Sequence, residues 1–435
     1  MILFKNGKIF DGQAFHEGLQ DVLVTEGRVD RIGPGIEADG AKRIDLGGKT
    51  LSPGFIDLHC HMRDPGFEWR EDIRTAAAAA ARGGFTTAVS MPNTDPAIDN
   101  DALIRYVIEK GKAAGFARVL PAGSVSKGRE GKELAEMGKM AEAGCVLFTD
   151  DGAPIGSPRL FRTALLYSRD LGVRIMEHPE ESSLSKGGHV NEGRCSSLSG
   201  LKGMPSSSEE IGVFKAISLC RETGVPVHVT HLSTGRSVHL VREAKKEGVP
   251  VTCDVTPHHL CLSEECVIDS GFDSRFKVNP PLRAKGDLEA LWGALSDGTV
   301  DAIATDHAPW HLDEKDLPFP EAPFGIPSLE CAFAAVYTEW LAKGQPFGIE
   351  RLMTLFTNGP ASILPKGWSD LGMLAPGSRA DLVVIDTDIE DSVSVSSWRS
   401  KARISAWEEK SLKGWPVMVF VEGKPVYSQQ GEKKK

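Results

Sequence analysis

Hydrophobic and polar residues alternate with a period of two near both ends of the chain. Short segments of this kind are separated by Gly and Asp turns, as in "DVLVTEGRVDRIG" (21–33) and "PVMVFVEGKPVY" (416–427). This period is typical of strands that bury one face. We therefore expect a small β-sandwich domain built from both termini, residues 1–52 and 366–435.

The middle of the chain, residues 53–365, has a different pattern. Short and nearly continuous apolar runs are each followed by a longer helical segment, such as 71–84 or 209–224. The eight runs lie at 55–59, 87–91, 118–122, 145–149, 173–177, 227–232, 251–255 and 301–305. Parallel strands need crossover helices, and barrel strands are buried on both faces. The pattern therefore predicts an α/β fold with a (β/α)8 TIM-type barrel as the catalytic domain.

Composition narrows the class of protein. The net charge of −10 gives no basic surface for nucleic acid, and the only basic run, "GEKKK" (431–435), is typical of a solvated tail. No apolar run approaches the roughly 18 residues of a membrane helix, and the N-terminus lacks a signal-peptide core. Eight cysteines without a CxxC pair favour reduced thiols. We expect a cytoplasmic enzyme that acts on a small molecule, with no membrane or nucleic-acid partner.

Ionisable residues recur where the predicted barrel strands end, which is where such barrels place their active sites. These residues are His59, His61, Asp150, Asp151, His178, His231 and Asp306. A single strand-end histidine is more often a core residue than a metal ligand, and an aspartate before glycine is often a turn residue. Those simpler explanations would all have to hold at the same end of one barrel. The set therefore indicates a metal site.

Other histidines are assigned elsewhere. His228 has the strand parity opposite to that of His231, so we predict that it faces the helices. His307 should likewise point away from Asp306. His258 and His259 follow the seventh strand, and we assign neither to metal.

Imidazole and carboxylate ligands suit Zn²⁺, with Mn²⁺ or Co²⁺ as replacements. The set exceeds what one tetrahedral ion uses, which favours two ions about 3.5–4 Å apart, bridged by a carboxylate and a hydroxide. The hydroxide would be the nucleophile, and Asp306 is best placed to move its proton to a leaving nitrogen. This arrangement predicts hydrolysis of an amide-like bond.

Longer motifs carry a family resemblance. The H-x-H after the first strand and "GMLAPGSRADLVVID" (372–386) resemble the amidohydrolase superfamily. More specific motifs resemble the class I dihydroorotases, and these motifs are "HCHMRDPG", "GGFTTAVSMPNT", "FTDDG", "VTPHHL", "KVNPPLR", "ATDHAP" and "APFGI". The resemblance implies zinc-dependent, reversible hydrolysis of (S)-dihydroorotate to N-carbamoyl-L-aspartate in pyrimidine biosynthesis. It also implies a homodimer and allows a complex with aspartate transcarbamoylase.

The resemblance assigns roles to single positions. It makes His59, His61 and Asp306 ligands of a first zinc, His178 and His231 ligands of a second, and Asp151 the bridge between the two. The residues that match substrate contacts are Arg63, Asn93, Asn279, Trp310 and, through the backbone of the 322–326 loop, Pro323 and Gly325. Arginine suits this role because its planar guanidinium binds a carboxylate through two parallel hydrogen bonds.

One position departs from the family pattern. The family has a histidine that contacts the substrate carboxylate where this chain has Trp310, and His311 follows. Either His311 swings in, or Arg63 binds the carboxylate with less help, or the preferred substrate differs. The last case favours another cyclic amidase, such as a hydantoinase or allantoinase. A further alternative is a catalytically inactive scaffold for aspartate transcarbamoylase, although a scaffold has no need for four converging histidines.

The charged, Pro-rich segment "DEKDLPFPEAPFG" (313–325) is typical of an exposed lid.

Overall fold

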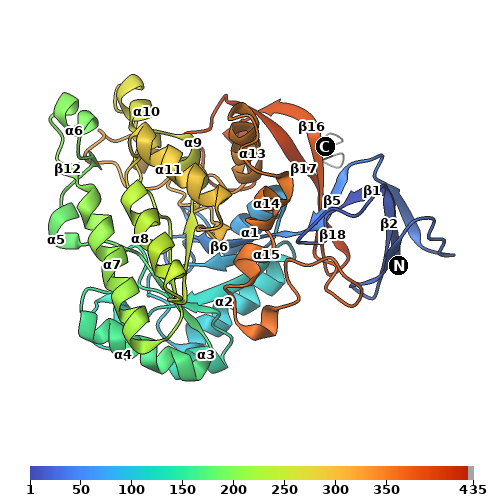
Figure 1. Ribbon diagram of the computed structural model, residues 1–435, viewed down its shortest axis with the longest axis horizontal. Coiled ribbons are helices and arrows are strands. Elements are labelled where there is room, and N and C mark those ends of the chain that lie inside the picture. The colour runs from blue at the N-terminus through green and yellow to red at the C-terminus, as the bar shows by residue number, and fades with distance from the viewer. Residues whose placement is uncertain (430–435) are drawn as a thin grey trace.

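A computed structural model describes residues 1–429 of the chain. A barrel surrounded by helices forms the larger part, and a sheet built from the two ends of the chain lies against one side of it (Figure 1). The basic tail predicted at 431–435 lies outside the described residues.

Eight parallel strands form the barrel in sequence order, each paired with the next. The strands are β6 (Phe55–Cys60), β7 (Phe85–Ser90), β8 (Arg118–Gly123), β9 (Leu147–Phe148), β10 (Arg174–Glu177), β13 (Val227–Val229), β14 (Val251–Val255) and β15 (Ala302–Ile303). Each overlaps one of the eight apolar runs, so the predicted barrel is confirmed.

The seam between β15 and β6 closes the barrel by single contacts rather than a ladder. Cys60 and His307 form an isolated parallel bridge, with the His61 N–H donating to the His307 carbonyl at 2.9 Å. Lower down, the carbonyl of Phe356 accepts from the backbone N–H of Ile56 at 2.8 Å. The seam brings the ends of the first and last strands together, which places His61 beside the Asp306 loop.

Helices follow the strands and cover the barrel. They are α1 (Ile73–Arg82), α2 (Asp101–Ala114), α3 (Met137–Glu142), α4 (Pro158–Leu171), α7 (Ser206–Thr223), α8 (Gly235–Lys246), α11 (Lys285–Ser296), α13 (Ala332–Ala342), α14 (Ile349–Thr354) and α15 (Asn358–Ala361). The predicted helices at 71–84 and 209–224 form as α1 and α7. A side-chain cap fixes the start of α1: the Asp72 carboxylate accepts from the Thr75 N–H at 2.8 Å, and Thr75 completes a capping box.

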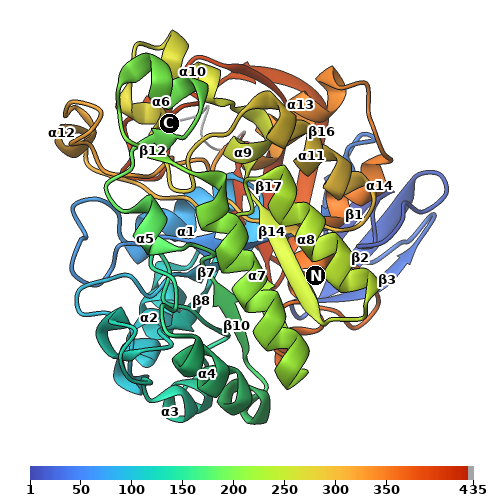
Figure 2. The same ribbon diagram turned by 60° about the vertical axis from the view of Figure 1, so that its left-hand side comes forward.

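Short elements extend the loops after the strands. They are α5 (Ser182–Ser185), β11 (Val190–Asn191), α6 (Arg194–Ser199), β12 (Gly203–Met204), α9 (Pro257–Cys261), α10 (Glu264–Asp269) and α12 (Leu312–Lys315), with the 3₁₀ turns η1 (Lys127–Arg129), η2 (Ser274–Phe276), η3 (Lys366–Trp368) and η4 (Val395–Ser397). Figure 2 shows α5, α6, β12 and α10 on the same side of the barrel. None of the described helices is long and apolar enough to cross a membrane.

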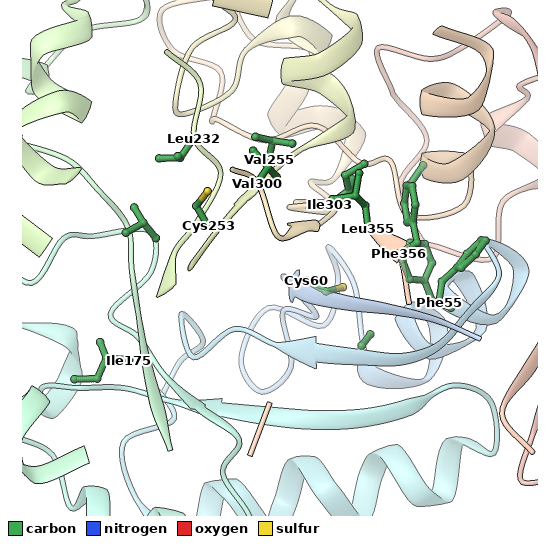
Figure 3. Packing of buried hydrophobic residues seen from close by; sticks show 14 of the residues in the cluster. Phe55, Cys60, Ile175, Leu232, Cys253, Val255, Val300, Ile303, Leu355 and Phe356 are labelled. Atoms are coloured by element: carbon green, nitrogen blue, oxygen red, sulfur yellow. The ribbon is translucent and has the colours of Figure 1, made fainter. Parts of the chain in front are cut away.

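The main hydrophobic core lies between the barrel strands and the helices (Figure 3). Phe55 stacks on Phe333 of α13 with ring centroids 4.8 Å apart and also contacts Phe356 at 5.3 Å. Because this core fills the space outside the strands, it leaves the strand ends free to carry polar groups.

The small sheet combines strands from both termini. They are β1 (Ile2–Ile9), β2 (Gln20–Thr25), β3 (Arg28–Gly33), β4 (Lys42–Asp45), β5 (Thr50–Pro53), β16 (Leu382–Ser392), β17 (Ser411–Val421) and β18 (Lys424–Ser428). The sheet order is β18-β17-β16-β5-β1-β2-β3, with β4 also paired to β1. The two halves join where Leu382 pairs with Pro53. The β domain predicted from both termini is confirmed.

The segment between β16 and β17 packs on the barrel rather than on the small sheet. Trp398 and Trp407 are buried in a cluster that includes Cys331 beside α13. The Glu330 carboxylate accepts from the backbone N–H groups of Arg399 and Ser400 at 2.8 and 3.0 Å. The C-terminal β region therefore also supports the part of the barrel that carries the last strand.

The predicted orientation of His228 is wrong. Its Nε2 lies 2.8 Å from Asp254 Oδ2, and Asp254 also contacts Thr230, so His228 faces the barrel interior and not the helices. Strand β13 ends at Val229, and His231 lies in a turn with a φ of 41°. The alternation of side chains therefore does not extend from His228 to His231, and the parity argument fails.

Candidate active site

Six buried ionisable side chains meet at the carboxyl ends of five barrel strands. They are His59 at the end of β6 and His61 after it, Asp151 after β9, His178 after β10, His231 after β13 and Asp306 after β15. All six are residues that the sequence indicated for the metal site. His307 points away from them, as predicted, and its Nδ1 accepts from the Ser328 N–H at 3.2 Å.

Asp151 lies between two pairs of histidines. Its Oδ2 is 3.1 Å from His59 Nε2 and 3.6 Å from His61 Nε2. Its Oδ1 is 3.3 Å from His178 Nδ1 and 3.5 Å from His231 Nε2. Each oxygen thus faces one pair, and the two groups have the ligand atoms and spacing that could hold metal ions. One carboxylate shared by two imidazole pairs is the arrangement of a bridging ligand.

Asp306 belongs to the side of His59 and His61. Its Oδ1 lies 3.0 Å from His61 Nε2 and 3.6 Å from His59 Nε2. Among the described residues, His59 Nε2 and Asp151 Oδ1 are buried without a hydrogen-bond partner. Unpaired polar atoms are expensive to bury. Unpaired ligand atoms of this kind, turned into one buried site, fit bound cations.

Electrostatics point the same way. Burial alone would raise the pKa of the Asp151 carboxyl, but the charge of His59 and the neighbouring rings of His178 and His231 hold this pKa well below its ordinary value. Although burial opposes it, Asp151 raises the pKa of His59 to about 9, and Asp151 and Glu180 raise the pKa of His178 to about 10. The buried carboxylates therefore require positive charge nearby. Metal ions supply that charge when they displace the ligand protons.

The outer nitrogens of three rings are held by other side chains. His61 Nδ1 lies 2.9 Å from Asn93 Oδ1, and His178 Nε2 lies 3.0 Å from Glu180 Oε2. His59 Nδ1 lies 2.9 Å from the Thr230 hydroxyl. Contacts of this kind leave the inner nitrogens available as ligands and fix the direction of each ring.

Backbone strain marks the same place. His231, Asp306 and Arg63 have φ values of 41°, 44° and 59°, in the left-handed region that non-glycine residues rarely adopt. Strained residues of this kind cluster at functional sites, because the surrounding structure must hold them.

A cavity of about 180 Å³ opens beside the six residues. Its walls include Arg63, Asn93, Asn279, Trp310, Phe324 and Gly325. These include all the predicted substrate contacts except Pro323. Pro323 does not line the cavity, since its carbonyl accepts from Lys315 Nζ at 3.1 Å, and Phe324 lines the wall beside it.

Comparison with known proteins identifies the family. Residues 48–237 match the family model described as Dihydro-orotase-like. The chain is 44% identical over 427 residues to a protein of Pelotomaculum thermopropionicum named dihydroorotase, covering 98% of both chains. It is 41% identical over 429 residues to a dihydroorotase of Acetivibrio thermocellus, covering 99% of both. The chain belongs to the dihydroorotase family.

Solved structures agree on the fold. An L-hydantoinase from Arthrobacter aurescens superposes with a TM-score of 0.84 at 25% identity, covering 98% of this chain and 96% of that one. A D-hydantoinase superposes with a TM-score of 0.82 at 23% identity, covering 99% and 95%. The barrel with a terminal β domain is thus common to both groups of proteins.

Trp310, which stands where the dihydroorotase pattern has a histidine, contacts two parts of the cavity wall. Its indole N–H donates to the Phe324 carbonyl at 2.7 Å. Two guanidinium groups lie over its ring, with Arg63 at 4.8 Å and Arg70 at 4.0 Å from the ring centroid. A Cβ on Gly325 would come within 2.9 Å of the indole nitrogen, so only glycine leaves room for this contact. Trp310 therefore joins the Asp306 loop to the 322–326 loop.

His311 does not take the place of the family histidine. About half of its side chain is exposed, and its Nδ1 accepts from the Asp313 N–H at the start of α12. Within the described chain, the cavity wall therefore has Arg63 as its cation, without help from His311.

Two buried lysines bind backbone carbonyls of the segment that was predicted as an exposed lid. Lys315 Nζ donates to the carbonyls of Pro323 and Gly325 at 3.1 and 3.0 Å, and Lys277 Nζ donates to those of Pro320 and Ala322 at 2.9 and 2.6 Å. Burial lowers the pKa of Lys315 to about 7 and that of Lys277 to about 8. Residues 311–313 and 316–318 are exposed. The exposed part and the cavity wall are thus separate pieces of one loop.

Two residues near the site were not assigned from the sequence. His258 is buried with Nε2 4.0 Å from Asp306 Oδ2, and Glu180 accepts from both His178 and the Asn279 amide, the latter at 2.9 Å. The "VTPHHL" motif pointed to His258, but no pattern distinguished it from His259, whose Nε2 lies 3.0 Å from the Pro280 carbonyl. Glu180 carried no signal of its own, because it lies on the loop beyond the strand.

Proposed function

We propose that this member of the dihydroorotase family catalyses the reversible hydrolysis of (S)-dihydroorotate to N-carbamoyl-L-aspartate, as a cyclic amide hydrolase of pyrimidine biosynthesis. One observation carries the proposal: a carboxylate shared by two histidine pairs lies beside a cavity whose wall contains a buried arginine. The identity to proteins named dihydroorotase over almost the whole chain supports it.

The donor set fits two zinc ions. His59, His61 and Asp306 would hold one ion, His178 and His231 the other, and Asp151 would bridge them. When bound, the ions supply an activated water at neutral pH and polarise the scissile carbonyl. Two imidazoles with shared carboxylates suit Zn²⁺ better than Mg²⁺ or Ca²⁺, which prefer oxygen ligands.

The other groups bind and orient the ring. Arg63 would take the substrate carboxylate. The Asn93 carbonyl oxygen is engaged with His61, so its amide N–H groups are free to donate to the substrate. The Asn279 amide donates to Glu180, so its carbonyl oxygen can accept from a ring N–H. The backbone of Gly325 at the wall completes the pocket.

Asp306 would move the proton. Burial opposes ionisation, but the hydrogen bond from His61 and the charge of His59 hold the pKa of Asp306 below its ordinary value, so it is ionised at neutral pH. An ionised carboxylate beside the nucleophile can accept its proton and pass it to the leaving ring nitrogen.

Hydrolysis assays test the proposal. Purified enzyme should hydrolyse dihydroorotate far faster than hydantoin, dihydrouracil or allantoin, and metal analysis should find two zinc ions per chain. Activity confined to the other three compounds would favour the hydantoinase-like alternative, which the Trp310 substitution suggests. Enzyme without tightly bound zinc or turnover would favour the scaffold. Three further expectations remain predictions. Size-exclusion chromatography with light scattering would test the homodimer, and co-purification would test an assembly with aspartate transcarbamoylase. Cell fractionation would test the cytoplasmic location.

A further inference from the structure

A column of polar side chains runs through the barrel interior toward the metal site. From the lower end upward its members are Arg174, Thr252, His228, Asp254 and Thr230, and it ends on His59. His228 and Thr230 are alternate residues after the start of β13, and Thr252 and Asp254 are alternate residues of β14, so both pairs face inward. His228, Asp254 and Thr230 are completely buried.

Three donors converge on the Asp254 carboxylate. They are the His231 backbone N–H at 2.6 Å, the Thr230 hydroxyl at 3.0 Å and His228 Nε2 at 2.8 Å. An ionised carboxylate only accepts, so each of these groups must give its hydrogen to Asp254. The His231 contact also holds the strained backbone of that residue.

The direction of the Thr230 hydroxyl then decides the state of His59. A hydroxyl has one hydrogen, and Thr230 gives it to Asp254. Its oxygen must therefore accept from His59 Nδ1, 2.9 Å away. A neutral imidazole carries one N–H, so His59 Nε2 is left with a lone pair directed at Asp151, 3.1 Å away. This is the tautomer that can bind a metal.

In the lower half of the column the hydrogen bonds also run in one direction, toward Asp254. His228 gives Nε2–H to Asp254, so its Nδ1 accepts from the Thr252 hydroxyl at 2.9 Å, and Arg174 donates to the Thr252 oxygen at 2.9 Å. The interior of such a barrel is normally filled by branched apolar side chains. Apolar side chains of similar volume would serve stability equally well. A fully paired polar column that leads to one ligand therefore needs a reason beyond packing.

We propose that Asp254 and Thr230 are positioning residues of the metal site. They fix His59 in the tautomer that presents Nε2 to the metal, and Asp254 also anchors His231 on the other side of the bridge. The inference rests on the proposed function, because it assumes that the two histidine pairs hold metal.

Asp254→Asn tests the direction of the column. An amide in place of Asp254 Oδ2 donates to the Thr230 oxygen, which turns the Thr230 hydroxyl toward His59 Nδ1. The hydrogen of His59 then moves to Nε2, where it opposes metal binding. We expect zinc affinity at the His59 side to fall about 10–100-fold, in line with other changes behind metal ligands. Metal-free protein labelled with ¹⁵N-histidine, held above the His59 pKa of about 9 so that this ring is neutral, should show one ring changing from the Nδ1–H to the Nε2–H form.

A matched set of threonine variants separates positioning from packing. Thr230→Val keeps the shape but removes the hydroxyl and should lower zinc affinity about tenfold, whereas Thr230→Ser should restore it. Thr87→Val is the control, because Thr87 is a buried barrel threonine that contacts Arg118 and has no link to the column. It should leave zinc affinity unchanged.

Zinc affinity is measured by competition with a chromophoric chelator, and circular dichroism checks folding. Equal affinity in wild type, Asp254→Asn and Thr230→Val would overturn the inference. Equal losses in Thr230→Val and Thr230→Ser would also overturn it, and this comparison decides the matter if Asp254→Asn does not fold. Wild-type protein that binds no zinc would instead refute the proposed function.

Discussion

Replacement of Arg63 by methionine should separate dihydroorotate from substrates that lack a carboxylate. Arg63 is 6% exposed and lines the cavity, and among the described residues only its Nε has an acceptor, the Pro309 carbonyl at 3.2 Å. Burial and the charge of Arg70 lower its pKa to about 10, so the side chain remains charged at neutral pH. Its two terminal nitrogens are free to bind a carboxylate in parallel.

The size of the effect follows from those two bonds. A hydrogen bond between charged groups contributes about 1.5–3 kcal/mol, so losing two costs about 3–6 kcal/mol. At about 1.4 kcal/mol per factor of ten, kcat/KM for dihydroorotate should fall roughly 10²–10⁴-fold. Arg63→Lys keeps the charge but not the planar fork and should lose less.

The assay compares dihydroorotate with dihydrouracil, which has the same ring without the carboxylate. The Met variant should lose its preference for dihydroorotate, while kcat/KM for dihydrouracil changes less than tenfold. The ratio of the binding affinities for orotate and uracil measures the same preference for a carboxylate without turnover. Zinc content should match the wild type, which shows that the metal site is intact. Equal losses on both substrates would refute the role of Arg63 as the carboxylate ligand.

Three further substitutions test other parts of the site. Asp306→Asn should lower kcat roughly 10²–10⁴-fold, the usual contribution of a general acid/base, and near-normal turnover would remove Asp306 from proton transfer. Trp310→Phe keeps an aromatic ring beside the two guanidinium groups but leaves the Phe324 carbonyl without its donor. It should raise KM several-fold with kcat little changed, and an unchanged KM would show that the 322–326 loop does not depend on that bond. Lys315→Met leaves the Pro323 and Gly325 carbonyls without a donor and should also raise KM. Because the pKa of Lys315 falls from 10.5 to about 7 on folding, the unfolded chain binds more protons between these values. Wild-type stability relative to Lys315→Met should therefore rise with pH from about 7 to 10.5 in chemical denaturation, and a constant difference would contradict the shift.

The barrel was predictable because its signal is local and repeated. Each strand is a short apolar run that the helices and the barrel interior bury on both faces, and all eight runs overlap observed strands. The segment at 393–412 was not predictable in the same way. Its polar, irregular sequence gives no period, and its position depends on Glu330, a residue more than sixty positions earlier that accepts from Arg399 and Ser400.

The arrangement of the candidate site was predictable only where strand geometry determines it. His59 and His61 lie at the end of a strand and point to one place, as alternation requires. The same rule failed for His228, because the chain leaves strand geometry before His231. Alternation therefore identifies ligands within a strand but not those in the turn after it, where tertiary contacts such as the one from Asp254 set the backbone.

Trp310 shows how the structure changes a question raised by the sequence. From the sequence, the substitution left three explanations, and one required His311 to reach the substrate. His311 instead caps α12, and the indole N–H of Trp310 is occupied by the Phe324 carbonyl, so neither residue offers the carboxylate a donor. Arg70 lies over the Trp310 ring and pairs with Glu314 at 2.6 Å, so its guanidinium is already engaged. Arg63 is then the cation of the described cavity wall, and we predict that the substrate carboxylate depends mainly on it. An enzyme with a second donor for the carboxylate would lose less kcat/KM when the arginine is removed. For this chain we therefore expect Arg63→Met to lower kcat/KM for dihydroorotate by about 10⁴-fold, the upper end of the range given above.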